Sequence, residues 1–211
     1  AGSNCYNCHM PHTSYGLLKA IRGHTIETPD VATTLETGRP NACNLCHLDK
    51  TLDWTAEHLA KRTDQPKAKV PPIHQTTAAS AVWLLNGDAG QRALAAWHMG
   101  WEPALLASGS GWQSPLLADT LTDPYSAVRY IAHKALVKQP GFVAYKYDFV
   151  ADEAKRLAKQ KEAMGIWLRE QRIKIPLPAG PVLLNAQGVR DVDRVQTLIR
   201  TRDNRPMRLR E

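Results

Sequence analysis

The sequence predicts an all-α protein: a loop-rich first segment, then helical hairpins, then an extended basic C-terminal arm. Two observations support this order. Prolines and glycines between residues 11 and 40 interrupt any long helix in the first segment. After the connector at residues 67–72, alanine-rich stretches repeat apolar residues at helical spacing and are separated by short turns. Because 43% of the 211 residues are hydrophobic, the chain has enough apolar side chains to form a globular core.

The first expected helices lie on either side of the connector. A helix is predicted over residues 51–62. A second helix, 75–85, ends at the turn Asn86-Gly87-Asp88. Asp88 is a suitable N-cap because its carboxylate can accept hydrogen bonds from the first backbone amides of a third helix, 88–99.

The next pair of helices follows a break at residues 109–111. A short helix is predicted over 114–121. Asp123-Pro124 then places a capping residue before a first-turn proline and predicts a helix that runs to about residue 138. The segment from Leu116 to Leu136 is similar to a HEAT-type repeat, and an ordinary α-hairpin bundle remains the alternative. The repeat-like residues are Asp123, Val128, Arg129, Ala132, Ala135 and Leu136.

The last segment is expected to be less regular. A long helix is predicted over 148–171, an extended proline-rich stretch over 175–181, and a short amphipathic helix over 189–200. The final residues, 201–211, read as an irregular basic arm. Residues 1–75, 76–145 and 146–211 are therefore expected to form three consecutive parts.

Two copies of the pattern Cys-x-x-Cys-His indicate the chemistry of the first part. Cys5 and Cys8 precede His9, and Cys43 and Cys46 precede His47. This spacing is the attachment signature of c-type haem. Two thiols form thioethers with the porphyrin, and the adjacent imidazole becomes the proximal iron ligand. Since the motifs use all four cysteines of the chain, the sequence predicts two covalent haems c.

Two other uses of the four cysteines compete with haem attachment. A zinc site built from both Cys pairs is possible, but it would not require a histidine directly after the second cysteine in both copies. A thioredoxin-type pair follows a strand, and no strand-like run precedes either motif. Haem attachment explains both the spacing and the histidines.

The second axial ligands are predicted to be His24 and His74, because both lie on connections that can bring an imidazole to a haem face. The preferred pairing is His74 with the first haem and His24 with the second. His58, His98 and His133 fall inside predicted helices and are expected to be surface or packing residues. Methionine ligation remains an alternative and would raise the reduction potential. The methionines are Met10, Met99, Met164 and Met207.

Charge and targeting signals limit the partners and the compartment. The formal net charge is +7, and residues 151–211 hold 14 Lys and Arg against 8 Asp and Glu. Such an excess favours an acidic redox partner, another subunit or an anionic surface, and nucleic acid is not expected. No apolar stretch approaches the roughly 18 residues of a membrane span. Since bacterial thioethers form outside the cytoplasmic membrane, we expect an exported, periplasmic chain that contacts membranes only through partners, with further sequence before Ala1.

The segment from Cys5 to Trp54 resembles a family of bacterial multihaem cytochromes. The resemblance implies paired haem motifs followed by HEAT or tetratricopeptide repeats, and a histidine that opens the first repeat helix, which His74 matches. The residues that carry it are Cys5, Cys8, His9, Met10, Pro11, Tyr15, Arg22, His24, Gly38, Pro40, Asn41, Ala42, Cys43, Cys46, His47, Asp49, Lys50 and Trp54.

The Cys-His-Met-Pro stretch is also similar to one haem motif of pentahaem cytochrome c nitrite reductases. That resemblance implies that His24, fifteen residues after His9, ligates a haem other than the one held by His9. The chain has no CxxCK motif, so the catalytic haem of those reductases has no counterpart here.

The favoured function is electron transfer between redox proteins or haem subunits, within a larger electron-transfer complex. Two saturated haems suit it, because a filled coordination sphere binds no substrate. The alternative is a multihaem enzyme, such as a dihaem peroxidase or a nitrogen-oxide or hydroxylamine reductase, with one open haem site.

Overall fold

The structure is a computed structural model and describes residues 4–63, 66–171 and 180–206. Helices make up 54% of the chain and strands 5%, which confirms a predominantly α-helical fold. The described residues form twelve helices and one two-stranded sheet. None of these helices is long and apolar enough to cross a membrane. The predicted helix at 51–62 is observed as α4 (Leu52–Thr63).

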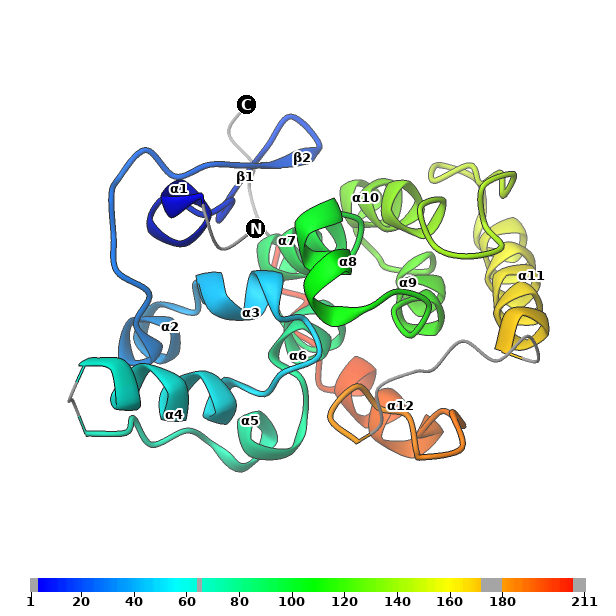
Figure 1. Cartoon of the computed structure of the whole chain (residues 1–211). Helices are drawn as coiled ribbons and strands as arrows, with labels where there is room; N and C mark the ends of the chain where they lie inside the picture. The colour runs from blue at the N-terminus through cyan, green and yellow to red at the C-terminus, as the bar shows by residue number, and fades with distance from the viewer. Residues whose placement is uncertain (1–3, 64–65, 172–179, 207–211) are drawn as a thin grey trace.

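The first segment contains more regular structure than the sequence suggested. Its short helices are α1 (Cys5–His9), α2 (Val31–Thr37) and α3 (Ala42–Cys46). A hairpin of β1 (Ser14–Gly16) and β2 (Lys19–Ile21) separates α1 from α2, with Tyr15 opposite Ala20. In Figure 1 this hairpin lies beside α1 at the top of the molecule, and it packs against α7.

The hairpin turn is the most strained part of this segment. Leu17 and Leu18 are its two loop residues, and both have positive φ, 49° and 55°. Two-residue turns with this geometry strongly prefer Asn-Gly, because a β-carbon collides with the backbone in the left-handed region. Leu17 is also 76% exposed, so burial does not offset the strain.

Replacing Leu17 with Asn and Leu18 with Gly is therefore expected to raise the free energy of unfolding by about 1–2 kcal/mol. Urea titration followed by circular dichroism measures the change. Leu106→Asn is the control, because Leu106 is an equally exposed leucine, at 79%, in the helix α8. If both variants change stability alike, removal of exposed leucine and not relief of turn strain is responsible.

The predicted helix at 75–85 is two helices, α5 (Pro72–Thr76) and α6 (Ala79–Leu85). The break is at Thr77 and Ala78. Ala78 forms a bridge with Thr51, and its amide donates to the Pro181 carbonyl at 2.8 Å. Long-range backbone pairing therefore overrides the local helical pattern.

The helices that follow were predicted more closely. α7 (Ala89–His98) begins at Asp88, whose carboxylate accepts from the Gln91 amide at 2.8 Å while the Gln91 side chain accepts from the Asp88 amide. α9 (Ser114–Thr120) and α10 (Ser126–Leu136) match their predicted positions. α8 (Glu102–Ser108) was not predicted.

The C-terminal elements are α11 (Glu153–Gln171) and α12 (Val192–Arg200). α11 begins five residues later than expected, because Asp152 accepts the hydrogen bond from the Lys155 amide that marks its N-terminus. The predicted extended stretch at 175–181 and the basic arm at 201–211 lie partly outside the described residues, and Met207 lies wholly outside them.

A continuous core joins all three parts of the chain. Leu45, Leu48 and Leu52 from the first segment belong to the same buried cluster as Trp83 and Leu198. α6 packs on α7, α7 on α10, and α9 on both α10 and α11. Figure 1 shows α7 in the middle of the molecule and α11 at one edge, far from α2 and α4. The two Cys-x-x-Cys-His motifs therefore lie on one side of a shared helical core.

A buried charge cluster fixes the start of α10 and the end of α12 together. Asp123 is fully buried; its Oδ2 lies 2.8 Å from Arg92 Nε and 3.0 Å from Arg202 Nη1. Arg92 Nη2 also donates to Asp123 Oδ1 at 3.3 Å. Asp123 was predicted to cap α10, but Tyr125 is the N-cap residue and the Asp123 carboxylate pairs with two arginines. Part of the basic excess of the C-terminal segment is thus neutralised inside the fold.

Candidate functional site: two adjacent Cys-x-x-Cys-His helices

Both cysteine motifs form single-turn helices, and the two helices pack against each other. At a spacing of three residues, the two thiols of each motif lie on the same face of the turn. Cys8 and the first residue of α3, Ala42, line a common small cavity. Cys5 and Cys8 are exposed, while Cys43 and Cys46 are half-buried. The fold therefore brings together two motifs that are 38 residues apart in the sequence.

Arg22 holds the first motif in place. Its Nη1 donates to the carbonyls of Tyr6 and Met10, at 2.8 and 2.9 Å, and its Nη2 donates to Asn7 Oδ1 at 2.6 Å. The guanidinium also lies 4.3 Å from the centre of the Tyr6 ring. A cation at this position is favoured by the carbonyls at the end of a helix; the Tyr6 carbonyl also accepts from the Met10 amide at 2.9 Å. Because α1 buries no side chain, Arg22 is its main link to the hairpin.

Asparagines and their neighbours hold the second motif. Asn41 is the N-cap residue of α3, and its Oδ1 accepts from the Cys43 amide at 3.0 Å. Asn44 is fully buried, donates to the Lys50 carbonyl at 3.1 Å and accepts from Thr55 Oγ1 at 2.7 Å. The second motif is therefore fixed by buried side chains of the protein core, whereas the first is fixed near the surface by Arg22 and by backbone bonds to residues 23 and 27.

His9 has the hydrogen bond expected of a metal-binding imidazole. Its Nδ1 lies 2.7 Å from the Glu27 carbonyl oxygen, which can only accept. The proton must therefore be on Nδ1, and the lone pair is on Nε2. A backbone carbonyl on Nδ1 is the usual outer-shell partner of a metal-ligating histidine.

His47 and His74 are kept neutral by their surroundings. Burial lowers the pKa of His47, although Asp49 opposes this, and burial also lowers the pKa of His74. The His47 ring lies 5.2 Å from that of Trp54. A neutral imidazole is the form that binds a metal. Nδ1 of His74 is buried and has no hydrogen-bond partner among the described residues.

The other predicted ligand, His24, is placed differently. It is exposed, in the turn between β2 and α2. Its loop runs along α1, because the Gly23 amide donates to the Pro11 carbonyl and the Glu27 amide donates to the His9 carbonyl. By contrast, α5, which carries His74, packs on α4, the helix that follows the second motif. The two predicted distal histidines thus lie near different motifs.

A cluster of aromatic rings lies behind the first motif. His12 packs against Trp97 and Trp101, with ring centres 4.8 and 5.4 Å apart, and its ring centre is 6.1 Å from that of His98. His98 is buried and bonds the Leu94 carbonyl through Nδ1. This cluster was missed by sequence reasoning, because His12 is 85 residues from Trp97. We name His12, Trp97, His98 and Trp101 the aromatic cluster.

Burial dominates the titration of His98 and lowers its pKa to about 3. Below its ordinary pKa of 6.5, the unfolded chain binds a proton that the folded chain does not, so stability must fall as the pH decreases from 6.5. His98→Gln removes this proton uptake. When the pH is lowered from 7 to 5, the unfolding free energy of the wild type is therefore expected to fall by about 2 kcal/mol more than that of His98→Gln.

Urea titrations of both proteins at the two pH values measure this difference. His58→Gln is the control, since His58 is exposed on α4. Equal pH dependence of the wild type and His98→Gln would contradict the assignment.

Burial keeps the Cys43 thiol protonated in the folded chain. The described chain contains no disulfide, and burial raises the pKa of the Cys43 thiol to about 11, with the neighbouring Cys8 adding to the shift. Zinc binds thiolates. Within residues 4–63, 66–171 and 180–206, no three His, Cys, Asp or Glu side chains are placed to hold a metal ion. Haem iron needs only axial ligands from the protein, and Nε2 of His9 is available as one.

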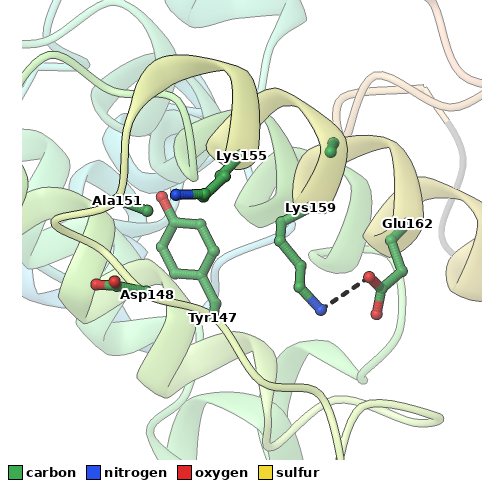
Figure 2. Close-up of a pocket in the computed structure, with 7 residues that line it drawn as sticks. Tyr147, Asp148, Ala151, Lys155, Lys159 and Glu162 are labelled. Carbon is green, nitrogen blue, oxygen red and sulfur yellow. Dashed lines mark hydrogen bonds and ion pairs between the residues drawn. The ribbon is translucent and has the colours of Figure 1, made fainter.

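A pocket of about 310 Å³ lies far from these motifs, between α11 and the preceding loop (Figure 2). Tyr147 lines this pocket, and its hydroxyl donates to the Leu121 carbonyl. Burial raises the pKa of Tyr147 to about 12. The Nζ atom of Lys159 is 2.8 Å from Glu162, so this lysine is paired. Figure 2 shows Lys155 on α11 beside this pocket, and its Nζ atom is 2.8 Å from Asp152 Oδ2. Among the lining residues there is no nucleophile held by a base, and we assign no chemistry to this pocket.

No protein-family model, curated protein or solved structure matches the chain in the three comparisons made with known proteins.

Proposed function

We propose that the chain is a dihaem c-type cytochrome that transfers electrons between redox proteins. The observation that supports this best is the hydrogen bond from His9 Nδ1 to the Glu27 carbonyl, at the end of a Cys-x-x-Cys helix. It leaves Nε2 free, on the residue that c-type attachment uses as the proximal ligand. The contact between α1 and α3 supports electron exchange between two groups held side by side.

Each proposed residue has a separate role. Cys5 and Cys8 hold the first haem, and Cys43 and Cys46 hold the second. His9 and His47 are the proximal ligands. Bound haem supplies one-electron redox chemistry; the protein supplies neutral, oriented imidazoles, and burial around His47 favours the neutral form.

His24 and His74 are the proposed distal ligands. The contact between α5 and α4 supports pairing His74 with the second haem, the reverse of the pairing preferred from the sequence. The loop of His24 runs along α1, which supports pairing His24 with the first haem. Export to the periplasm and assembly with other haem subunits remain part of this proposal.

Production in a bacterial host with the c-type maturation system tests the proposal. Two haems per chain are expected in the pyridine haemochrome assay, and peptide mass spectra should show one haem on each Cys-x-x-Cys-His peptide. Electron paramagnetic resonance is expected to show low-spin iron with two imidazole ligands. Protein that lacks covalent haem would end the proposal. Carbon monoxide binding to half of the reduced haem would instead favour the enzyme with one open site.

A further inference from the structure

An open groove of about 430 Å³ lies between the hairpin tip and helices α7 and α10. Leu17 and Leu18 form its upper edge, and Trp97, Tyr130 and Val137 line the side formed by α7 and α10. We name it the hairpin groove. Trp97, Tyr130 and Val137 are half-buried. Partly exposed aromatic and aliphatic side chains around a concave surface are typical of protein-binding sites, where Trp and Tyr are enriched among the residues that dominate affinity.

The hairpin tip exposes its leucines in strained backbone conformations. Leu17 and Leu18 are 76% and 39% exposed, and both occupy backbone conformations that favour Asn and Gly. Strained, solvent-exposed apolar residues are concentrated at functional surfaces, because only function compensates for their cost. The tip therefore presents two leucines toward something outside the chain.

The charge around the groove identifies the kind of partner. Lys19, Lys134 and Lys138 are exposed at its edge, and no carboxylate is among its lining residues. Lys138 Nζ donates to the Gly100 carbonyl at 2.8 Å, so its charge is held at the groove and is not paired with an acid there. A cationic edge around an apolar centre attracts an acidic protein surface and increases its association rate.

The groove also adjoins the first motif. Trp97 lines the groove, and its ring centre lies 4.8 Å from that of His12 in the aromatic cluster. His12 is three residues after His9. A protein bound in the hairpin groove would therefore lie against the part of the fold that carries Cys5, Cys8 and His9.

We propose that an acidic face of a redox partner protein docks in the hairpin groove, with apolar contacts to Leu17, Leu18 and Trp97 and ion pairs to Lys19, Lys134 and Lys138. The docking gives electrons access to the group held by Cys5 and Cys8. The redox identity of the partner and this last step rest on the proposed function; the binding of an acidic protein surface does not require haem.

The experiment uses an acidic flavodoxin as the probe and measures its affinity for the full chain by titration calorimetry. Binding is expected to weaken by at least about tenfold from 20 to 200 mM salt. The triple variant Lys19→Glu, Lys134→Glu, Lys138→Glu is expected to lose about tenfold or more in affinity at low salt. Lys61→Glu, Lys155→Glu, Lys161→Glu is the matched control, with the same change in net charge on helices that do not line the groove.

A second variant separates docking from folding. Leu17→Asn with Leu18→Gly suits the turn better, so it folds, and it is expected to weaken flavodoxin binding by about tenfold. Equal affinity of this variant and the wild type overturns the proposal, as does equal loss in the groove and control lysine variants. Absent salt dependence, or absent binding, also overturns it. Binding to vesicles of phosphatidylglycerol, lost in the Leu17 and Leu18 variant while flavodoxin binding is retained, would instead assign the tip to a membrane surface.

Haem content, measured on the same samples, keeps the two proposals distinguishable. Chain without covalent haem that still binds flavodoxin through the groove would end the proposed function but retain the docking site. Chain with two haems that dithionite reduces, but whose flavodoxin affinity none of the variants alters, would retain the proposed function and end the docking site.

Discussion

Replacing Asp123 with alanine is expected to lower the free energy of unfolding by about 3–5 kcal/mol, the usual effect of removing one member of a buried charge cluster. Asp123 is fully buried, and Arg92 is only 1% exposed. Without the carboxylate, the Arg92 guanidinium keeps its charge in the interior and lacks a counterion. The Tyr125 amide also loses its acceptor, Asp123 Oδ1, at 2.8 Å. Few surface substitutions approach this effect.

Chemical unfolding monitored by circular dichroism measures the loss. The matched control is Asp203→Ala, because Asp203 forms an exposed ion pair with Arg205 at 2.6 Å, and such a pair is worth about 0–1 kcal/mol. Asp123→Asn keeps the shape and is expected to fall between the two. A loss below about 1 kcal/mol for Asp123→Ala would show that Arg92 finds another partner or reaches water.

The second large effect concerns haem content. The proposed function predicts that replacing Cys43 and Cys46 with serine reduces covalent haem from two groups to one, and that replacing Cys5 and Cys8 does the same. The two variants should differ in local order. α3 buries Ala42, Asn44 and Leu45, whereas α1 buries no side chain. Loss of a large apolar group should therefore loosen α1 more than α3.

Pyridine haemochrome assays and amide hydrogen exchange test both statements. In the Cys5 and Cys8 variant, amides of residues 5–9 are expected to exchange freely, while in the Cys43 and Cys46 variant those of residues 42–46 should remain protected. A double variant in both motifs, with no covalent haem, provides the baseline. Unchanged haem content in either pair variant would mean that the corresponding thiols do not carry haem.

Much of the fold follows from local signals. The capping role of Asp88 could be predicted from the sequence, because Asp88 and Gln91 are only three residues apart. Their side chains bond each other's backbone amides, and no distant residue is required. α8 was missed, although it has a signal: Glu102 and Pro103 occupy its first turn, where acids and proline are favoured.

Other features depend on residues far apart in the chain, and no local pattern contains them. The break at Ala78 requires Thr51 and Pro181, and the partners of Asp123 are 31 and 79 residues away. The hairpin at Leu17 and Leu18 lacks the residues that identify such a turn. At the candidate site, the sequence identified the cysteines and the histidines that follow them. The hydrogen bonds from Arg22 to α1 and from His9 to the Glu27 carbonyl could be found only in the folded structure.

The shared core has a practical consequence for anyone who wishes to transplant the cysteine-bearing segment into a different scaffold. Leu45, Leu48 and Leu52 lie in one cluster with α6, and Ser80 Oγ donates to the Leu48 carbonyl at 2.6 Å. Excised at residue 75, the segment would present three leucines and an unpaired carbonyl to water. The smallest portable unit therefore extends at least through α6, and a successful graft would have to carry that helix with it.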